Sequence, residues 1–377
     1  MIPFIDLAAQ FAARETAIRS RMDAVLAHGK YIMGPEVREL EQRLAAYIGS
    51  AHCVTCASGT DALMLPLMAE GVGPGDAVIT TSFTFIATAE VISLLGARPV
   101  FVDIEADTWN ISPRAVQECL ANWNPGWGRP RAIIAVDIFG LPAAAVELRR
   151  IADEHGLLLI EDAAQSFGAS LDGKRAASFG HYAATSFFPA KPLGCYGDGG
   201  AVFCAHAEQA ARLDSLRVHG KGTDKYDNVR IGVNSRLDTL QAAIVLAKLD
   251  YFDEELAARQ QVAQTYAAAL AELGDRAILQ NISVGAVSAW AQYSLLASDG
   301  SVRAAAQEIL KSAGIPTAVY YPKPLHLQTA FAHLGYRAGD LPVCENVCSR
   351  IFSLPMHPYM PQGQAKAIAA KAAAALA

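Results

Sequence analysis

The chain has 377 residues, of which 52% are hydrophobic and 18% are charged, and its formal net charge at pH 7 is −6. The negative charge argues against a nucleic-acid-binding surface. The sequence contains no run of about 18 apolar residues, so no membrane span is predicted. The length suits one large domain and a smaller one, and a charged fraction below the roughly 25% typical of soluble domains predicts a large core and a sizeable subunit interface.

Two helices are expected before the first strand. Residues 8–30 are polar and amphipathic, and four apolar residues recur at helical spacing between positions 37 and 48, ahead of Gly49, which suits a helix C-cap. The apolar run HCVTCA (52–57) then predicts a strand, and residues 58–61 separate it from another helical run.

Short apolar runs recur through the next part of the chain and predict further strands. They cover residues 77–80, 99–103, 133–138, 157–161, 182–188 and 200–204. Helix-like segments such as 87–95 and 144–155 lie between many of them. Apolar runs that alternate with helices predict an α/β fold with a mostly parallel central sheet covered on both faces.

The pattern changes from about Leu240. Residues 238–275 look like one long helix, strands are expected at 292–297 and 317–321, and an alanine-rich helix runs from Gly363. We therefore predict a large domain over residues 1–248, with its N-terminal helical segment, and a small α+β domain over residues 249–377.

The start of the chain, MIPFIDLAAQ, lacks the basic and apolar regions of a secretion signal, and seven scattered cysteines suit a reducing compartment, so we expect a cytoplasmic protein. Cys53 and Cys56 form C-x-x-C, but a zinc site needs a second such pair, and Cys344 and Cys348 have helical spacing. We expect buried, unreactive thiols and no metal site, because the histidines also lack ligand spacing.

The most informative stretch is ATSFFPAKPLGCYGDGG, residues 184–200. A buried strand is predicted to end at a turn that carries Lys191 between two prolines and ahead of four glycines, so this lysine lies on a stiff, tight backbone. A lysine becomes a nucleophile toward carbonyl groups when its amine is desolvated or lies beside positive charge, because its pKa then falls. On spacing alone, an ordinary surface charge is the alternative.

Residues at other strand ends could join this lysine, because ligands collect beyond the carboxyl ends of parallel strands. In Ser58-Gly59-Thr60-Asp61, the glycine lets backbone N–H groups approach an anion at a helix N-terminus, and Thr60 adds a hydroxyl. An ordinary helix cap is the alternative here, since serine, threonine and aspartate are the usual N-caps.

Two more strand ends carry a carboxylate and a pair of aromatic rings. Asp162 closes a fully apolar run, so it needs a partner such as a protonated ring nitrogen, and Gln165 could bond another edge of the same ligand. Asp162 could instead cap the next helix. After the strand near residue 80, Phe83 or Phe85 could offer a flat platform to a ring, although core packing is the commoner role of a phenylalanine.

These features form a set: a positioned lysine, a strand-end carboxylate, a glycine-threonine helix start and an aromatic ring. Pyridoxal 5′-phosphate requires such a set, with a lysine for the covalent link, an acid for the pyridinium proton and a helix end for the phosphate. The residues therefore predict this cofactor.

The same residues resemble the sugar aminotransferases of the DegT/DnrJ/StrS type, which have the aspartate-aminotransferase fold (fold type I of the enzymes that use this cofactor). The matching motifs are SGTDAL (58–63), TSFTFIATAE (81–90), IEDAAQSFGA (160–169), TSFFPAKPLGCYGDGGA (185–201) and GVNSRLDTLQAA (232–243). They occur in family order and spacing, and the resemblance extends from IDLAAQ at the start to SLPMHPYM near the end.

The resemblance implies roles for individual residues. Lys191 would bind the cofactor covalently and later transfer a proton between cofactor and substrate, while Asp162 would pair with the pyridine nitrogen. Gln165 would contact the ring hydroxyl, and Phe85 would stack on the ring.

The resemblance also implies a shared phosphate site. Gly59, Thr60 and Ser186 would hold the phosphate, and Asn234 would reach it from the neighbouring subunit. The protein would therefore be a homodimer with two shared active sites.

Within the family, the long matches look most similar to 3-aminotransferases of bacterial surface-polysaccharide (O-antigen) synthesis. These transfer the amino group of glutamate, which leaves as 2-oxoglutarate, to UDP-2-acetamido-2-deoxy-3-oxo-glucuronate. Arg236 is the expected partner of the sugar carboxylate, because a guanidinium suits one, and Tyr320 and Tyr321 are expected to contact the sugar. Histidine is usual in that group at the position of Tyr320, so sugar recognition departs from its pattern.

Three alternatives stay open. The substrate could be a 3-keto- or 4-keto-6-deoxy sugar bound to dTDP or UDP. A dehydratase on the same scaffold is a second alternative, but those relatives usually have histidine in place of the lysine. A non-catalytic regulatory protein is the third, although such a copy should have lost part of the cofactor set.

Overall fold

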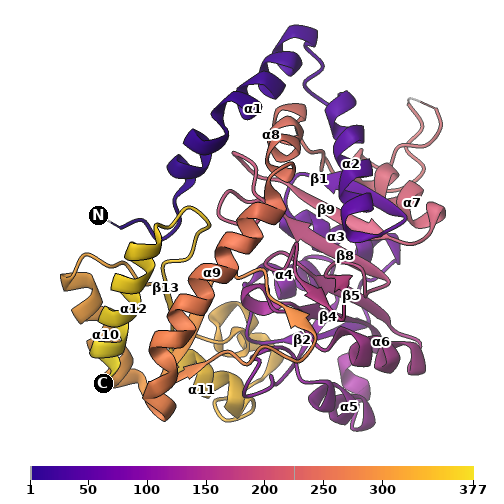
Figure 1. Cartoon of the computed structure of the whole chain (residues 1–377). Coiled ribbons are helices and arrows are strands. Elements are labelled where there is room, and N and C mark those ends of the chain that lie inside the picture. The colour runs from indigo at the N-terminus through magenta and orange to yellow at the C-terminus, as the bar shows by residue number, and fades with distance from the viewer. Residues whose placement is uncertain (1, 225) are drawn as a thin grey trace.

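A seven-stranded sheet lies at the centre of the fold, in a computed structural model that describes residues 2–224 and 226–377 (Figure 1). Its strands, in sheet order, are β1 (His52–Cys56), β9 (Gly200–Cys204), β8 (Tyr182–Ser186), β5 (Leu158–Asp162), β4 (Arg129–Val136), β2 (Asp76–Thr81) and β3 (Arg98–Val102). β9 runs antiparallel to both of its neighbours, and every other neighbouring pair is parallel. The predicted mostly parallel sheet is confirmed, with strand ends shifted by a few residues.

Helices cover both faces of this sheet, which explains why its strands are apolar throughout. In β4, Ile133 packs with the helices on one face and its neighbour Ile134 packs with those on the other, and both are fully buried. The first face is covered by α2 (Pro35–Ile48), α5 (Pro113–Ala121), α6 (Ala145–Glu154) and α8 (Thr239–Leu249). The second face is covered by α3 (Gly59–Ala69), α4 (Ala87–Leu94) and α7 (Ala207–Arg217).

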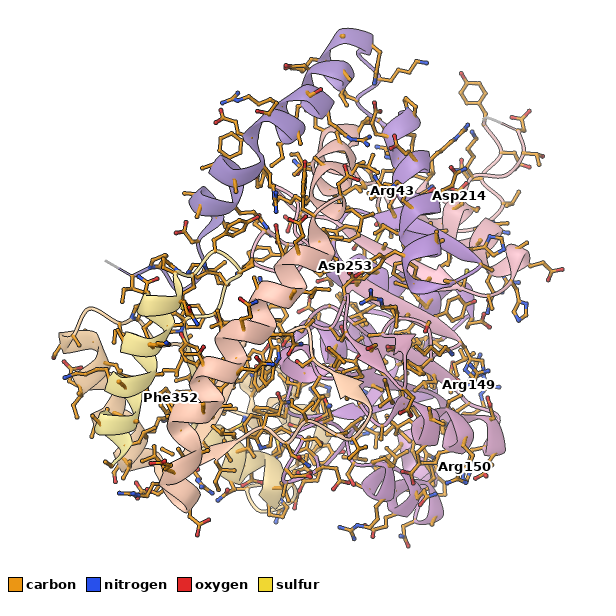
Figure 2. All side chains as sticks on the ribbon, viewed as in Figure 1. Arg43, Arg149, Arg150, Asp214, Asp253 and Phe352 are labelled. Atoms are coloured by element: carbon orange, nitrogen blue, oxygen red, sulfur yellow. The ribbon has the colours of Figure 1, made fainter. Side chains whose placement is uncertain are left out.

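The C-terminal part has its own antiparallel sheet and apolar core. The sheet consists of β10 (Ala277–Leu279), β12 (Tyr293–Ala297) and β13 (Ile351–Leu354), where Phe352 is fully buried (Figure 2). The helices of this part are α9 (Phe252–Leu270), α10 (Gly300–Ser312), α11 (Pro342–Arg350) and α12 (Gln362–Leu376). Apart from Ile2 at its margin, this core is built from residues 262–376. The division into domains 1–248 and 249–377 stays a prediction.

Two elements differ from their expected form. The helix expected over 238–275 is interrupted at Asp250 and Tyr251, between α8 and α9. The strand expected over 317–321 is wrong: only Ala318 pairs, in a single bridge to Ser353 of β13. The chain then leaves the sheet edge, because Tyr320 and Tyr321 pack instead in an apolar cluster with residues of the large sheet's end.

α1 (Leu7–His28) packs along α8, although the two helices lie far apart in the sequence (Figure 1). The start of α9 is tied to the large sheet's layer by the exposed side chain of Asp253, which is labelled near the centre of the view in Figure 2. Asp253 accepts hydrogen bonds from the Tyr47 hydroxyl of α2 at 2.7 Å and from Arg175 at 3.2 Å. A two-residue strand pair, β6 (Ser170–Leu171) and β7 (Lys174–Arg175), with β11 (Ala286–Val287), completes the fold.

The C-terminal part also grips the turn that follows β2. The Ser82 hydroxyl shares a hydrogen bond of 2.8 Å with Nδ1 of His326, whose Nε2 lies 3.1 Å from Glu345 of α11. Next to it, Phe83 is fully buried against Phe139 and Tyr321. None of the helices in the described part of the chain is both long and apolar enough to cross a membrane.

Candidate active site

The carboxyl ends of four parallel strands, β1, β8, β5 and β2, lie at one edge of the large sheet. Each is followed at once by residues that the sequence singled out. Gly59 follows β1, Ser186 ends β8, Asp162 ends β5, and Phe85 comes shortly after β2. Parallel strands therefore bring together residues as far apart in the chain as Gly59 and Ser186, as the strand-end argument predicted.

Asp162 is buried and held on two sides. The Thr88 hydroxyl donates to its Oδ2 at 2.9 Å, and the backbone N–H of Ala164 donates to its Oδ1 at 3.3 Å. Burial raises the pKa of this carboxyl, while the bond from Thr88 and the charge of Lys191 oppose that rise. These donors and the nearby lysine therefore favour the carboxylate form against the effect of burial.

Lys191 is half-buried, and its amine lies near enough to Asp162 for the two charges to interact. Burial lowers the pKa of the lysine amine, and the nearby carboxylate of Asp162 partly offsets this effect. The backbone N–H of Lys191 donates to the carbonyl of Phe188 at 2.8 Å, which closes a tight turn. The structure therefore places a desolvated amine opposite a carboxylate, as a lysine nucleophile requires.

The start of α3 offers backbone donors beside Ser186. The Ser58 hydroxyl caps the helix by accepting from the N–H of Asp61 at 3.1 Å. A Cβ on Gly59 would lie 2.6 Å from Cβ of Ser186, so only glycine allows the helix start and the end of β8 to come this close. Thr60 follows in the first turn of the helix. This arrangement suits a phosphate group.

The two phenylalanines after β2 have different environments. Phe83 is fully buried in the core, whereas Phe85 is 57% exposed and thus free to face a ring. Gln165 is buried, and its Oε1 accepts from the N–H of Phe139 at 2.7 Å. Its side chain also interacts with the Tyr321 hydroxyl, whose pKa is raised by burial and by the nearby charge of Asp162. Tyr321 therefore joins Gln165 and Asp162.

Two expected residues, Asn234 and Arg236, make no side-chain hydrogen bond or ion pair with this group in the described part of the chain, and a third, Tyr320, reaches it only through Tyr321. Asn234 is exposed, and the side chains of Asn234 and Arg236 make no hydrogen bond or ion pair with any residue of 2–224 or 226–377. Between them, the Ser235 hydroxyl donates to Asp61 at 2.7 Å and accepts from the N–H of Ala57 at 3.2 Å, so this segment lies beside the start of α3. Tyr320 is half-buried, with its ring 5.9 Å from that of Tyr321.

Sequence reasoning missed two residues that support the site. Thr88 lies within one of the matching motifs but gave no chemical signal of its own. Lys248 was visible as a single charge in the apolar run LQAAIVLAKL, and its ammonium donates to the Gly194 carbonyl, three residues after Lys191, at 2.7 Å. The prediction of buried thiols at Cys53 and Cys56 is confirmed, and burial raises the pKa of both.

The site's residues fit pyridoxal 5′-phosphate on the chemistry of their donors. An amine of lowered pKa and a buried carboxylate face one another, and a glycine-lined helix start lies at the end of the strand that leads to the lysine. A phenylalanine ring is exposed at the same sheet edge.

Comparison with known proteins gives the same family along the whole chain. Residues 13–373 match the DegT/DnrJ/EryC1/StrS aminotransferase family. The chain is 47% identical over 370 residues to a UDP-2-acetamido-2-deoxy-3-oxo-D-glucuronate aminotransferase of Pseudomonas aeruginosa, covering 98% of this chain and 99% of that protein. It is 41% identical over 373 residues to a pleiotropic regulatory protein of Geobacillus stearothermophilus, covering 99% and 98%. A crystal structure of a DegT DnrJ EryC1 StrS aminotransferase from Brucella abortus superposes with a TM-score of 0.94 at 48% identity, covering 99% and 98%.

Proposed function

The chain belongs to the DegT/DnrJ/EryC1/StrS aminotransferase family, and from that premise we propose that it transfers the amino group of glutamate to UDP-2-acetamido-2-deoxy-3-oxo-D-glucuronate. The single observation that supports this most is the pair formed by Lys191 and Asp162, a desolvated amine and a buried carboxylate in one site. The product would be a 3-amino sugar nucleotide for surface polysaccharide such as O-antigen.

The cofactor is pyridoxal 5′-phosphate. When bound, it supplies an electron sink that lets an amino group leave one substrate and join another. Lys191 would bind it in this proposal, and because burial lowers the pKa of the amine, its Nζ is more readily deprotonated than an ordinary lysine and can accept and return a proton. The Asp162 carboxylate, oriented by Thr88, holds the proton of the ring nitrogen.

The remaining cofactor residues orient it. Gly59, Thr60 and Ser186 hold the phosphate, because the first turn of α3 presents its N–H groups there. Phe85 would stack on the ring, and Gln165 would contact the ring hydroxyl.

We further propose a homodimer in which Asn234 of each subunit reaches the phosphate of the other. Its exposure and its lack of a side-chain partner among the described residues leave it available for such a contact. Ile32 and Ile231 are 47% and 89% exposed, and such apolar surface suits a subunit interface. The free state of all seven cysteines suits a cytoplasmic location.

Arg236, Tyr320 and Tyr321 are the proposed sugar-binding residues, and Arg236 would bind the carboxylate. The test is a panel of keto-sugar nucleotides incubated with glutamate and scored by release of 2-oxoglutarate, with the 3-oxo-glucuronate generated in place by a dehydrogenase. We expect turnover with the uronate and a loss of about 10–100-fold in kcat/KM for Arg236→Ala, because a hydrogen-bonded charge pair is removed.

Arg230→Ala is the matched control, since Arg230 lies on the same segment but donates to Ser215. Equal losses in both variants, or turnover of a 6-deoxy keto sugar alone, would contradict the uronate assignment and favour the dTDP- or UDP-deoxysugar alternative. A regulatory role, as in the name of the Geobacillus relative, would be favoured instead if the protein bound no pyridoxal phosphate.

A further inference from the structure

Lys248 is an almost completely buried cation with no part in the transfer of an amino group. It lies in α8, its exposed fraction is 1%, and its ammonium donates to the carbonyl oxygen of Gly194 at 2.7 Å. The same ammonium lies 4.1 Å from the centre of the Tyr196 ring. Because burying a charge is costly unless it is paired, these contacts must matter to the fold or to the site.

Gly194 and Tyr196 belong to the turn that carries Lys191. In this turn the N–H of Cys195 donates to the carbonyl of Phe187 at 2.7 Å. A Cβ on Gly194 would lie 2.6 Å from the carbonyl oxygens of Phe188 and Pro189, so the backbone doubles back on itself there. Within 2–224 and 226–377, Lys248 is the one donor to the Gly194 carbonyl.

A buried carboxylate supports the ammonium. Glu255 of α9 is 4% exposed, and its charge favours the protonated form of Lys248. Gln10 of α1 and the Tyr359 hydroxyl donate to Glu255 at 3.1 and 2.6 Å. The carboxylate is thus oriented by the two ends of the chain.

We propose that Lys248 is a positioning residue for Lys191: its ammonium fixes the turn around residues 188–196 so that the Lys191 amine faces Asp162. Lys248 donates a hydrogen bond to the backbone of the turn. Gln241, about two turns earlier in α8, bonds the same turn by accepting from the N–H of Tyr196 at 2.8 Å. The inference rests on Lys191 being the cofactor-binding lysine, as proposed above.

The charge of Lys248 gives the inference a pH signature. Burial lowers the pKa of Lys248 to about 8, opposed by Glu255 of α9 and by Cys195 of the turn. Tyr196 of the turn lies against the ammonium. Glu255 in turn faces the Tyr359 hydroxyl, the charge of Arg259 in α9 and the uncharged Gln10 of α1. As the pH rises through that value, the ammonium loses its proton and its hold on the carbonyl weakens.

The experiment compares the cofactor-loaded Lys248→Met and Lys248→Arg proteins with the parent. For Lys248→Met we expect kcat of the glutamate half-reaction to fall at least about tenfold with little change in KM, because a small misplacement of a catalytic group lowers the rate steeply. We expect Lys248→Arg to recover most of that loss and to move the alkaline limb of kcat to higher pH, since guanidinium stays charged.

Binding of pyridoxal phosphate to the apoproteins is the second readout, and we expect slower formation of the lysine-bound absorbance in Lys248→Met. Arg303→Met is the control, since Arg303 is a partly buried cation in α10 that donates to the Cys348 carbonyl within the C-terminal part instead, and it should leave kcat of the folded protein unchanged. A Lys248→Met protein with parental kcat, alkaline limb and cofactor binding would overturn the inference, and so would a folded Lys248→Arg protein no better than Lys248→Met. Failure of the proposed function would appear separately, as a parent protein that binds no pyridoxal phosphate or as lysine-bound absorbance that survives in Lys191→Ala.

Discussion

Thr88→Val tests how Asp162 keeps its charge inside the protein. The Thr88 hydroxyl donates to Asp162 Oδ2 at 2.9 Å, and both side chains are buried, with exposed fractions of 1% and 5%. Valine has nearly the shape of threonine but no hydroxyl, so the substitution removes the donor and leaves little room for water to replace it.

The expected magnitude follows from the charge of the acceptor. A hydrogen bond to a charged group contributes about 1.5–3 kcal/mol, which corresponds to about 10–100-fold in an equilibrium or a rate. The bond from Thr88 lowers the pKa of Asp162 against the effect of burial, so its loss raises that pKa further. The acidic limb of kcat should therefore move to higher pH, and the free energy of unfolding should fall more at neutral pH than below about pH 3, where the carboxyl is largely protonated in both states.

The assay is kcat of the glutamate half-reaction between about pH 5 and 9, followed by the absorbance of the bound cofactor. Thr84→Val is the matched control, because Thr84 shares a hydrogen bond of 3.0 Å with the Thr88 hydroxyl but none with Asp162. If Thr88→Val kept an unshifted acidic limb and a kcat within about twofold of the control, the role given to this donor would be refuted.

Two further predictions concern the cofactor's two ends. Lys191→Ala should keep the fold but lose the lysine-bound absorbance and turnover, because among the described residues no other amine interacts with Asp162. Spectra of the purified variant test this, and normal activity would exclude Lys191 as the cofactor lysine. Gly59→Ala should raise the Kd of pyridoxal phosphate at least about tenfold, since the new Cβ would lie 2.6 Å from Ser186 Cβ and push the helix start away from β8. Titration of the apoprotein measures this Kd, and a parental value would show that the phosphate binds elsewhere.

The sequence predicted the sheet edge where the site lies because its signals are local. Each strand is an apolar run, and Gly59, Asp162 and Lys191 each lie within three residues of the end of such a run. Parallel strands end at a common edge, so three local patterns sufficed to place these residues together without knowledge of the strand order.

Thr88 and Lys248 could not be found in this way, because their partners depend on the tertiary arrangement. Thr88 follows β2, and it reaches Asp162 at the end of β5 across the end of β4, which only the strand order reveals. Lys248 bonds a carbonyl 54 positions earlier in the chain. The strand expected at 317–321 failed for the same kind of reason, since β13 offers this segment only a single bridge.

The contacts between the C-terminal part and the turn after β2 determine whether a truncated protein could fold. A fragment that stops at residue 248 would lack His326 and Tyr321, which contact Ser82 and Phe83 just before Phe85. The apolar face around Phe83 would then be bared to water, and the ring platform would lose its backing. Truncation at the predicted domain boundary after residue 248 should therefore yield an aggregating polypeptide rather than a minimal vitamin B6 binder.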